Sequence, residues 1–263
     1  GSEPSGEMIP PNPRANRIAR DITYAHGAAT RGGRTVIRLL ENTTGRLKLI
    51  RRARGYSDEV ARGRDFWQVI CDRYDLRLEV VGGSLDDIPA TGPLVVVANH
   101  PYGILDGLMM GRILSDRRSG DFRVLAHQIF RRAPDLERVI LPISFDESRA
   151  ATESNLATRA EALRYLAAGG AIGIFPGGTV STGLRPFDPP MDPGWRTFTA
   201  RMIARSGAMV VPVFFEGRNS RLFQIASHLH PNLRVGLLIR EFRARIGRPC
   251  RAVIGSALSS APK

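Results

Sequence analysis

Cysteine is scarce in this chain. Cys71 and Cys250 are the only two among its 263 residues, and they stand far apart in the sequence. Two isolated cysteines supply neither a disulfide framework nor the paired spacing of a zinc site. We therefore expect a protein of a reducing compartment that holds no structural metal.

Long apolar runs are also absent. A transmembrane helix needs about 20 consecutive, mainly apolar residues, and no run of that length occurs. Residues 1–18 are polar and rich in proline, and we predict a disordered lead there with no signal peptide. Any membrane contact is then expected to come from the surface of the protein.

Lysine is rare, whereas arginine is abundant. Lysine and arginine together number 38, the only lysines are Lys48 and Lys263, and the formal net charge is +13. Guanidinium groups bind carboxylates and phosphates through paired hydrogen bonds, so this charge predicts an acidic partner. The arginines are not interleaved with stacking aromatic residues and no nucleic-acid-binding motif occurs. We therefore expect an anionic membrane surface as the partner, and no nucleic acid.

The region over residues 19–75 is rich in basic and apolar residues. Over 33–54 the two kinds are interleaved, with an interruption at 43–45. This pattern predicts one or two amphipathic helices that lie in a membrane interface with arginines toward anionic head groups. The alternative is a surface helix packed on the core. A further helix is predicted from Ser57, as its N-cap, to Arg73. Residues 19–75 are interpreted as a membrane-contact region.

Strands and helices alternate from residue 76 onward. The alternation predicts a single α/β domain over 76–263, with a mixed, largely parallel sheet flanked by helices. The predicted strands span 76–81, 94–98, 123–126, 139–145, 171–175, 209–215 and 252–254. The predicted helices span 104–115, 152–168 and 195–206, and the last two stop at Gly169 and Gly207.

A histidine and a carboxylate follow the second predicted strand. Residues 99–107 read Asn-His-Pro-Tyr-Gly-Ile-Leu-Asp-Gly. A regular helix would place His100 and Asp106 about 240° apart, but Pro101 keeps the histidine out of helical conformation and Gly103 permits a turn. If a helix begins directly after the glycine, Asp106 reaches back to the imidazole as the orienting partner of a general base. The alternative is a structural histidine beside a helix-capping aspartate.

A second strand end leads into a Gly-Gly turn that is rich in hydroxyl groups. Backbone N–H groups of such a turn can stabilise an oxyanion, although the turn can also be purely structural. The Gly-x-Ser-x-Gly spacing of a nucleophile elbow is absent, which argues against a serine hydrolase. The candidate oxyanion and substrate-binding residues are Gly177, Gly178, Thr179 and Ser181.

A third strand end leads into Glu216-Gly217-Arg218-Asn219-Ser220. Charge and amide groups at a strand end are typical of polar head-group recognition, and the alternative is a salt-bridged loop. Glu216, Arg218 and Asn219 are therefore candidates for binding the head group of an acceptor.

In this order and at these distances, the three segments resemble a known family. Asn-His-Pro followed by Asp, then Phe-Pro-x-Gly-Thr, then Val-Val-Pro-Val are similar to the motifs of the PlsC-type glycerolipid acyltransferases over about residues 76–255. Asn-His-Pro-x-Gly-x-x-Asp-Gly and Gly-Arg-Asn-Ser-x-Leu-Phe most resemble the branch that O-acylates lyso-aminolipids such as lyso-ornithine lipid. The resemblance implies acyl transfer from acyl-ACP (a thioester on acyl-carrier protein) or acyl-CoA to a lipid hydroxyl.

The chain departs from the family pattern at two points. One residue more than usual separates His100 from Asp106. Gly177 and Val180 stand where the family has the glutamate and arginine that hold a glycerol phosphate acceptor. The resemblance therefore points away from lysophosphatidic acid and toward an acceptor without a phosphate monoester, such as a carboxylate that an arginine fork can bind.

The resemblance implies direct transfer, with His100 as the base, Asp106 as its orienting group and the 177–179 turn as the oxyanion site. No metal or redox cofactor is implied, because the thioester donor is a substrate. We expect a peripheral bacterial protein on the cytoplasmic face of the inner membrane. The alternatives are a 1-acylglycerol-3-phosphate or other lysophospholipid acyltransferase, and a non-catalytic arginine-rich protein that binds anionic surfaces.

Overall fold

The computed structural model describes residues 31–44, 46–99, 104–127, 131, 134–144, 148–176, 193–217, 220, 229 and 231–259. Its helices are α2 (Arg31–Thr44), α3 (Arg46–Ala53), α4 (Tyr56–Ala61), α5 (Phe66–Arg73), the 3-10 helix η2 (Leu85–Asp87), α6 (Ile104–Arg118), α7 (Pro134–Glu137), α8 (Arg149–Ala167), α9 (Pro193–Ser206) and α11 (Pro231–Arg245). Its strands are β1 (Arg77–Gly82), β2 (Leu94–Ala98), β3 (Arg123–His127), β4 (Ile140–Ile143), β5 (Ala171–Ile174), β6 (Met209–Phe215), β7 (Pro249–Ile254) and β8 (Leu258–Ser259).

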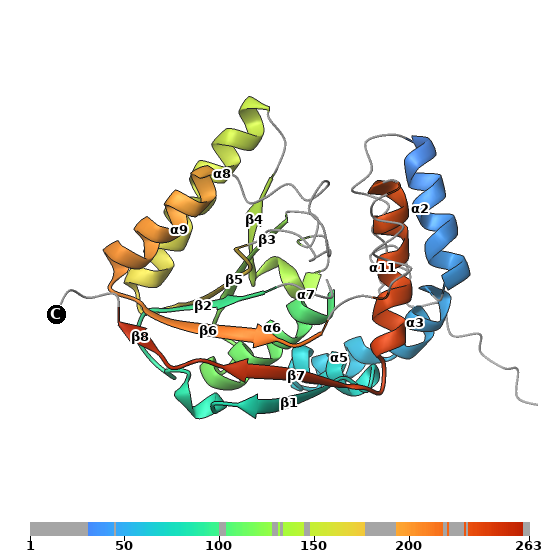
Figure 1. Cartoon of the computed structure of the whole chain (residues 1–263), viewed down its shortest axis with the longest axis horizontal. Coiled ribbons are helices and arrows are strands. Elements are labelled where there is room, and N and C mark those ends of the chain that lie inside the picture. Colours follow the sequence, from blue (N-terminus) through green and yellow to red (C-terminus); the bar gives the residue numbers. More distant parts are fainter. Residues whose placement is uncertain are drawn as a thin grey trace, which may run out of the picture.

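The described strands form one mixed sheet in the order β1-β7-β6-β2-β5-β3-β4, with β8 paired to β6 (Figure 1). Strands β6, β2, β5, β3 and β4 run parallel to one another, whereas β7 is antiparallel to β6 and parallel to β1. The parallel strands all end at the same edge of the sheet, which we call the carboxyl edge. The predicted fold class, an α/β protein with a largely parallel mixed sheet, is confirmed.

Helices cover the sheet on both faces. In β2, Leu94 and Val96 belong to one apolar cluster with α5 and α6, and the intervening Val95 belongs to another with α8 and α9. Each face of the strand is therefore buried, which is why its sequence is apolar at consecutive positions.

Helix α6 approaches α5 closely because residue 111 is a glycine. A Cβ atom at Gly111 would lie 2.2 Å from a ring carbon of Trp67. The Trp67 ring is 6% exposed and packs against Phe122 with ring centroids 5.7 Å apart. The indole therefore lies between α6 and Phe122, the residue that precedes β3.

The last turn of α6 is bonded to the edge of the sheet opposite the carboxyl edge, where the parallel strands begin; we call it the amino edge. The Arg118 guanidinium donates hydrogen bonds to the carbonyl oxygens of Pro89, Gly92 and Gly169, at 3.0, 2.7 and 3.1 Å. Burial lowers the pKa of Arg118. This arginine therefore fixes the position of α6 through backbone contacts rather than through an ion pair.

The single helix predicted from Ser57 to Arg73 is wrong. The structure contains two helices, α4 and α5, and the N-cap of α4 is Gly55. The chain turns at Gly63, whose φ is 96°, and Asp65 then caps α5 by accepting a hydrogen bond from the Gln68 amide at 3.0 Å. A left-handed glycine followed by a capping aspartate starts a new helix.

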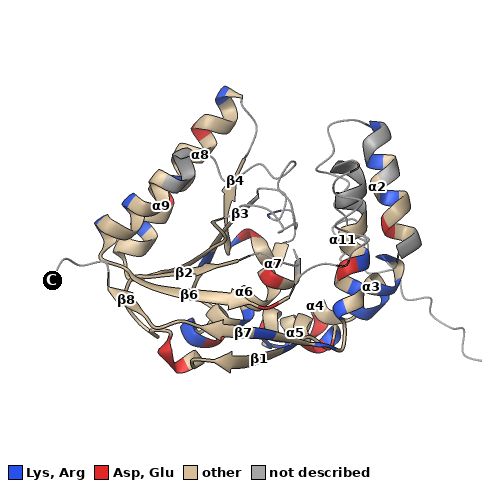
Figure 2. Cartoon of the chain, viewed as in Figure 1, with Lys and Arg blue, Asp and Glu red and all other residues tan. Residues whose placement is uncertain are grey.

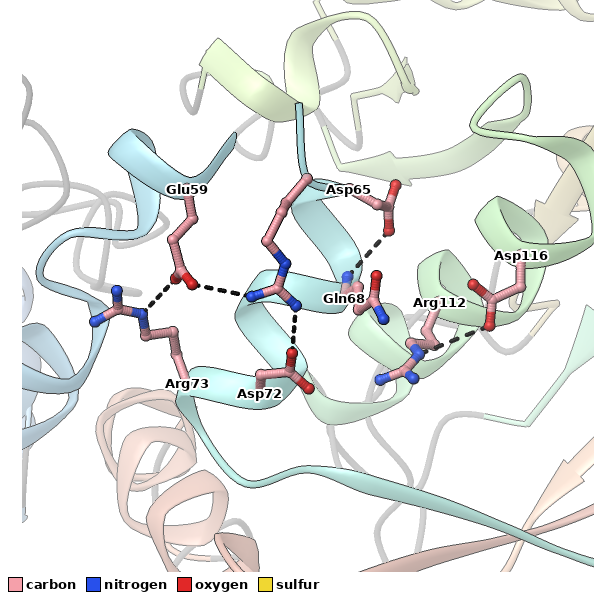
Figure 3. A network of polar contacts seen from close by, with 8 residues as sticks. Glu59, Asp65, Gln68, Asp72, Arg73, Arg112 and Asp116 are labelled. Carbon is pink, nitrogen blue, oxygen red and sulfur yellow. Dashed lines mark hydrogen bonds and ion pairs between the residues drawn. The ribbon is translucent and has the colours of Figure 1, made fainter. Parts of the chain in front are cut away.

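A network of ion pairs spans this break (Figure 3). The Glu59 carboxylate accepts hydrogen bonds from Arg64 at 2.9 Å and Arg73 at 2.8 Å, and Arg64 also donates to Asp72 at 2.6 Å. The hydrogen bond from Arg73 is the main cause that lowers the pKa of Glu59. Because the network is open to solvent, its role is to orient α4 against α5 more than to stabilise the fold.

Two helices occupy the region predicted to be amphipathic: α2 ends at Thr44 and α3 begins at Arg46. Ile37 of α2 and Leu49 of α3 are buried, and α2 lies beside α11 near the carboxyl edge (Figure 1). The outer side exposes Leu39 and Leu47, by 62% and 53%. One side of these helices packs on the protein, as the surface-helix alternative requires, and membrane contact through the exposed side stays a prediction.

Among the described residues, no helix is both long enough and apolar enough to cross a membrane.

We predict that Gly111→Ala lowers the free energy of unfolding by about 1–3 kcal/mol, because the new methyl group collides with the Trp67 ring. The matched control is Gly107→Ala in the same helix, where a Cβ meets no described atom within 4 Å; it should be neutral or stabilising by up to about 1 kcal/mol. Urea denaturation of the full chain measures both. Equal stability of the two variants would contradict the close packing.

Candidate active site

Three of the polar segments predicted from the sequence leave the same edge of the sheet. Strand β2 lies between β5 and β6, with Val97 in register with Ile174 and Ala98 in register with Val213. Their carboxyl ends are therefore adjacent, which is where α/β proteins place binding sites. Asp106 and Glu216 are described by the structure. The other predicted site residues, His100, Gly177, Gly178, Thr179, Ser181, Arg218 and Asn219, lie outside the described residues.

The side chain of Asn99 joins the ends of β2 and β6. Its amide N–H donates to the Phe215 carbonyl at 2.8 Å, and its side-chain oxygen accepts from the Phe215 N–H at 2.7 Å. The side-chain amide of Asn99 thus forms the donor and acceptor hydrogen bonds that the backbone of a neighbouring strand would otherwise form with Phe215. Asn99 directly precedes His100 and Phe215 directly precedes Glu216, so this contact fixes two exit points of the chain at once.

A second asparagine makes the same kind of contact at the end of β4. Asn155 of α8 accepts from the Ser144 N–H at 2.9 Å and donates to the Ser144 carbonyl at 2.8 Å. Sequence reasoning assigned no role to either asparagine. The role of Asn99 could have been inferred from its position, because it places a primary amide at the end of a buried strand, directly before the His-Pro pair.

Asp106 lies in the first turn of α6 and is fully buried. Its charge reaches the first residues of β7: burial raises the pKa of the Cys250 thiol to about 12, with Asp106 as the next cause. The predicted position of Asp106, in the first turn of a helix beginning at residue 104, agrees with the structure. A buried carboxylate requires partners that stabilise its charge, which an imidazolium would provide.

The segment after β6 is anchored at both ends. The Glu216 N–H donates to the Arg251 carbonyl at 2.9 Å, and the backbone then bends at Gly217, whose φ is 112°. At the far end, the Ser220 N–H donates to the buried Glu241 carboxylate of α11 at 3.1 Å, and the Ser220 hydroxyl also binds it. Glu241 was missed by sequence reasoning, because α11 itself was not predicted.

A cavity of about 350 Å³ opens beside the end of β6. The residues that line it are Glu216, Gly217, Arg245, Arg248, Pro249 and Arg251. Among these residues, Glu216 was predicted from the sequence to belong to the site, and the three arginines were not.

Within the described part of the chain, no group of three or more histidine, cysteine, aspartate or glutamate residues could hold a metal ion. The two cysteines are buried, and burial raises the pKa of Cys71 as well as that of Cys250. Neither thiol is therefore suited to act as a nucleophile at neutral pH.

The fold and the three strand ends define an α/β protein with its candidate site at the carboxyl edge of a largely parallel sheet. The sequence pattern of a family described as Acyltransferase matches residues 79–216, just over half of the chain. The protein therefore belongs to the acyltransferase family, and the resemblance inferred from its motifs is confirmed.

Two curated relatives are both named lyso-glycine lipid O-acyltransferase. The one from Phocaeicola vulgatus is 30% identical over 162 residues, which are 61% of this chain and 54% of the relative. The one from Bacteroides thetaiotaomicron is 27% identical over 167 residues, 61% of this chain and 56% of the relative. The matched part of the chain thus spans about half the length of these relatives.

A solved structure, the 1-acyl-sn-glycerophosphate acyltransferase PlsC from Thermotoga maritima, aligns with 94% of this chain and 83% of its own, at a TM-score of 0.40 and 17% identity.

We predict that Asn99→Ala speeds amide exchange at Phe215, because that N–H loses its acceptor. Asn155→Ala is the matched control and should speed exchange at Ser144 instead. Each variant is expected to lose about 1–3 kcal/mol of stability, the cost of leaving buried polar groups unpaired. Hydrogen exchange resolved by residue is the measurement. Unchanged protection of Phe215 in Asn99→Ala would contradict the assigned contact.

Proposed function

We propose that the protein is an O-acyltransferase that moves a fatty acyl group from acyl-ACP or acyl-CoA to the hydroxyl of a lyso-aminolipid. The observation that carries the proposal is Asp106, a fully buried carboxylate in the first turn of the helix that follows the Asn-His-Pro segment. The family match covers this segment, and both named relatives are O-acyltransferases.

The proposed reaction is a direct transfer from the acyl thioester to the lipid hydroxyl. His100 removes the proton of the acceptor hydroxyl, and the oxygen attacks the thioester carbonyl. Backbone N–H groups over 177–179 stabilise the tetrahedral oxyanion. When it collapses, the C–S bond breaks and His100 returns the proton to the departing thiolate. Asp106 orients the imidazole and stabilises its protonated form, and Thr179 and Ser181 supply hydroxyl groups near the oxyanion.

The proposed acceptor carries a carboxylate rather than a phosphate monoester. Gly177 and Val180 replace the two charged family residues that bind glycerol phosphate, and the relatives are named for a lyso-glycine lipid. Arg218 and Asn219, beside Glu216, are proposed to contact the head group. Competition between lyso-glycine lipid, lyso-ornithine lipid and lysophosphatidic acid tests this choice, and a preference for lysophosphatidic acid would overturn it.

The outer side of α2 and α3 is the proposed membrane-contact surface, defined by Leu39 and Leu47 together with Arg34, Arg38 and Lys48. All five side chains are exposed, and Figure 2 shows basic residues along both helices. Apolar side chains enter the interface while basic ones bind anionic lipid. This surface would hold the protein peripherally at the cytoplasmic face of the inner membrane.

We predict that His100→Ala lowers kcat by about 10²–10⁴-fold, the contribution of a general base. Asp106→Asn should also lower kcat, and it should move the acid limb of the pH–rate profile to lower pH. The reason is that the base must be neutral to act, and loss of the carboxylate makes the imidazole harder to protonate. Initial rates from pH 5 to 9 with acyl-CoA or acyl-ACP measure both effects.

The matched control is Asp116→Asn, which removes an exposed carboxylate from the same helix, 3.7 Å from Arg112. It should leave kcat and the pH profile unchanged. Circular dichroism establishes that each variant is folded. A folded His100→Ala protein with full activity would overturn the assignment of the base.

We predict that Leu39→Glu/Leu47→Glu weakens binding to vesicles of phosphatidylglycerol by about ten-fold or more. The matched control is Leu156→Glu/Leu258→Glu, which places the same charges on α8 and β8 at leucines that are 55% and 59% exposed. Vesicle sedimentation at fixed salt measures binding. Equal loss in both double variants would show a general charge effect and would contradict a specific surface.

A further inference from the structure

The cavity beside the end of β6 combines charges of both signs. Arg245, Arg248 and Arg251 face a single carboxylate, Glu216, so the lining carries a net charge of +2. Arg248 and Arg251 are exposed, and their side chains form no ion pair with any described residue. An anion in the cavity would be attracted to both of these guanidinium groups. The cavity therefore has the composition of a binding site for an anion.

The backbone on one side of the cavity is held in place by the turn between α11 and β7. Gly247, with a φ of 77°, donates its N–H to the Asp75 carbonyl at 3.1 Å, and Arg77 donates to the Gly247 carbonyl at 2.8 Å. The Arg248 N–H closes the turn on the Arg245 carbonyl at 3.0 Å. The backbone on this side of the cavity is therefore fixed without a ligand, which lowers the entropic cost of binding.

The cavity adjoins the proposed catalytic segment. Glu216 directly follows Phe215, which is bonded to Asn99, the neighbour of His100. A ligand in the cavity would thus lie beside the end of β6 that Asn99 joins to the end of β2.

We propose that this cavity receives the amino-acid head group of the acceptor: Arg248 and Arg251 bind its carboxylate, and Glu216 binds its amino group where it has one. The inference rests on the proposed function and extends it to head-group specificity. Guanidinium groups bind carboxylates through charge-assisted hydrogen bonds. A phosphate of the thioester donor is the competing occupant, but Glu216 would repel a doubly charged phosphate.

Binding of two acceptor-like probes to the full chain tests the proposal without requiring turnover. The probes are N-decanoylglycine and N-decanoylornithine, below their micellar concentrations, with N-decanoylglycinamide as the probe that lacks a carboxylate. Calorimetric titration should show that Arg248→Gln/Arg251→Gln raises the Kd of both carboxylate probes by about 10- to 100-fold. The amide should bind this variant and the parent protein equally.

Glu216→Gln separates the two amino-acid probes. It should weaken N-decanoylornithine, which loses the partner of its ammonium group, and leave N-decanoylglycine unchanged or bound more tightly. The matched control for charge is Arg62→Gln/Arg149→Gln, at exposed arginines of other helices, and it should change neither Kd.

Kinetics with palmitoyl-CoA and with palmitoyl-ACP distinguish the competing occupant. If Arg248→Gln/Arg251→Gln raises the KM of a donor and leaves the Kd of N-decanoylglycine unchanged, the cavity holds the donor phosphate and the proposal is overturned. If the parent protein binds the carboxylate probes, and Arg248→Gln/Arg251→Gln weakens that binding, but no acyl group is transferred, the proposed function fails while the head-group site stands.

Discussion

The paired hydrogen bonds between the Asn99 side chain and the Phe215 backbone determine the layout of the carboxyl edge. A parallel strand pair lacks the tight turn that holds the ends of a hairpin together, so β2 and β6 would be free to separate where they leave the sheet. The primary amide closes this end with two hydrogen bonds in a part-buried setting. The points where the chain leaves β2 and β6 are thereby held together.

Helix α6 runs from the carboxyl edge of the sheet to the amino edge, and its position is fixed by contacts at several points. Arg118 binds backbone carbonyls at the amino edge, and the missing side chain of Gly111 lets the helix press against Trp67. With its last turn and its middle fixed, the first turn has little freedom. Asp106 is therefore held buried at the carboxyl edge by contacts along the whole helix, and a side chain held in this way can orient a partner.

Much of the sheet could be predicted from the sequence, and most of the contacts between its segments could not. Strands β2 and β6 have the predicted bounds because both read as apolar runs; β2 is buried on both faces, whereas β6 exposes Pro212 and Phe214. The break between α4 and α5 was missed because it depends on the left-handed backbone of Gly63, and α11 was missed altogether. Strand β7 begins at Pro249, earlier than predicted, because pairing with β1 draws Arg251 into the sheet. The cavity joins residues 216 and 245–251, a proximity that sequence spacing does not reveal.

The arginine excess is divided between structural and surface roles. Arg117 donates two hydrogen bonds to the Ile88 carbonyl, and Arg118 donates one to each of three other carbonyls. Arg46 is 8% exposed, and burial lowers its pKa. Such residues contribute to the formal charge of +13 but little to the field felt by a ligand. Exposed guanidinium groups on α2 and α3 and in the cavity lining remain open to solvent instead. The same residue type can therefore hold the backbone in one place and stay available to a ligand in another, and burial decides between the two.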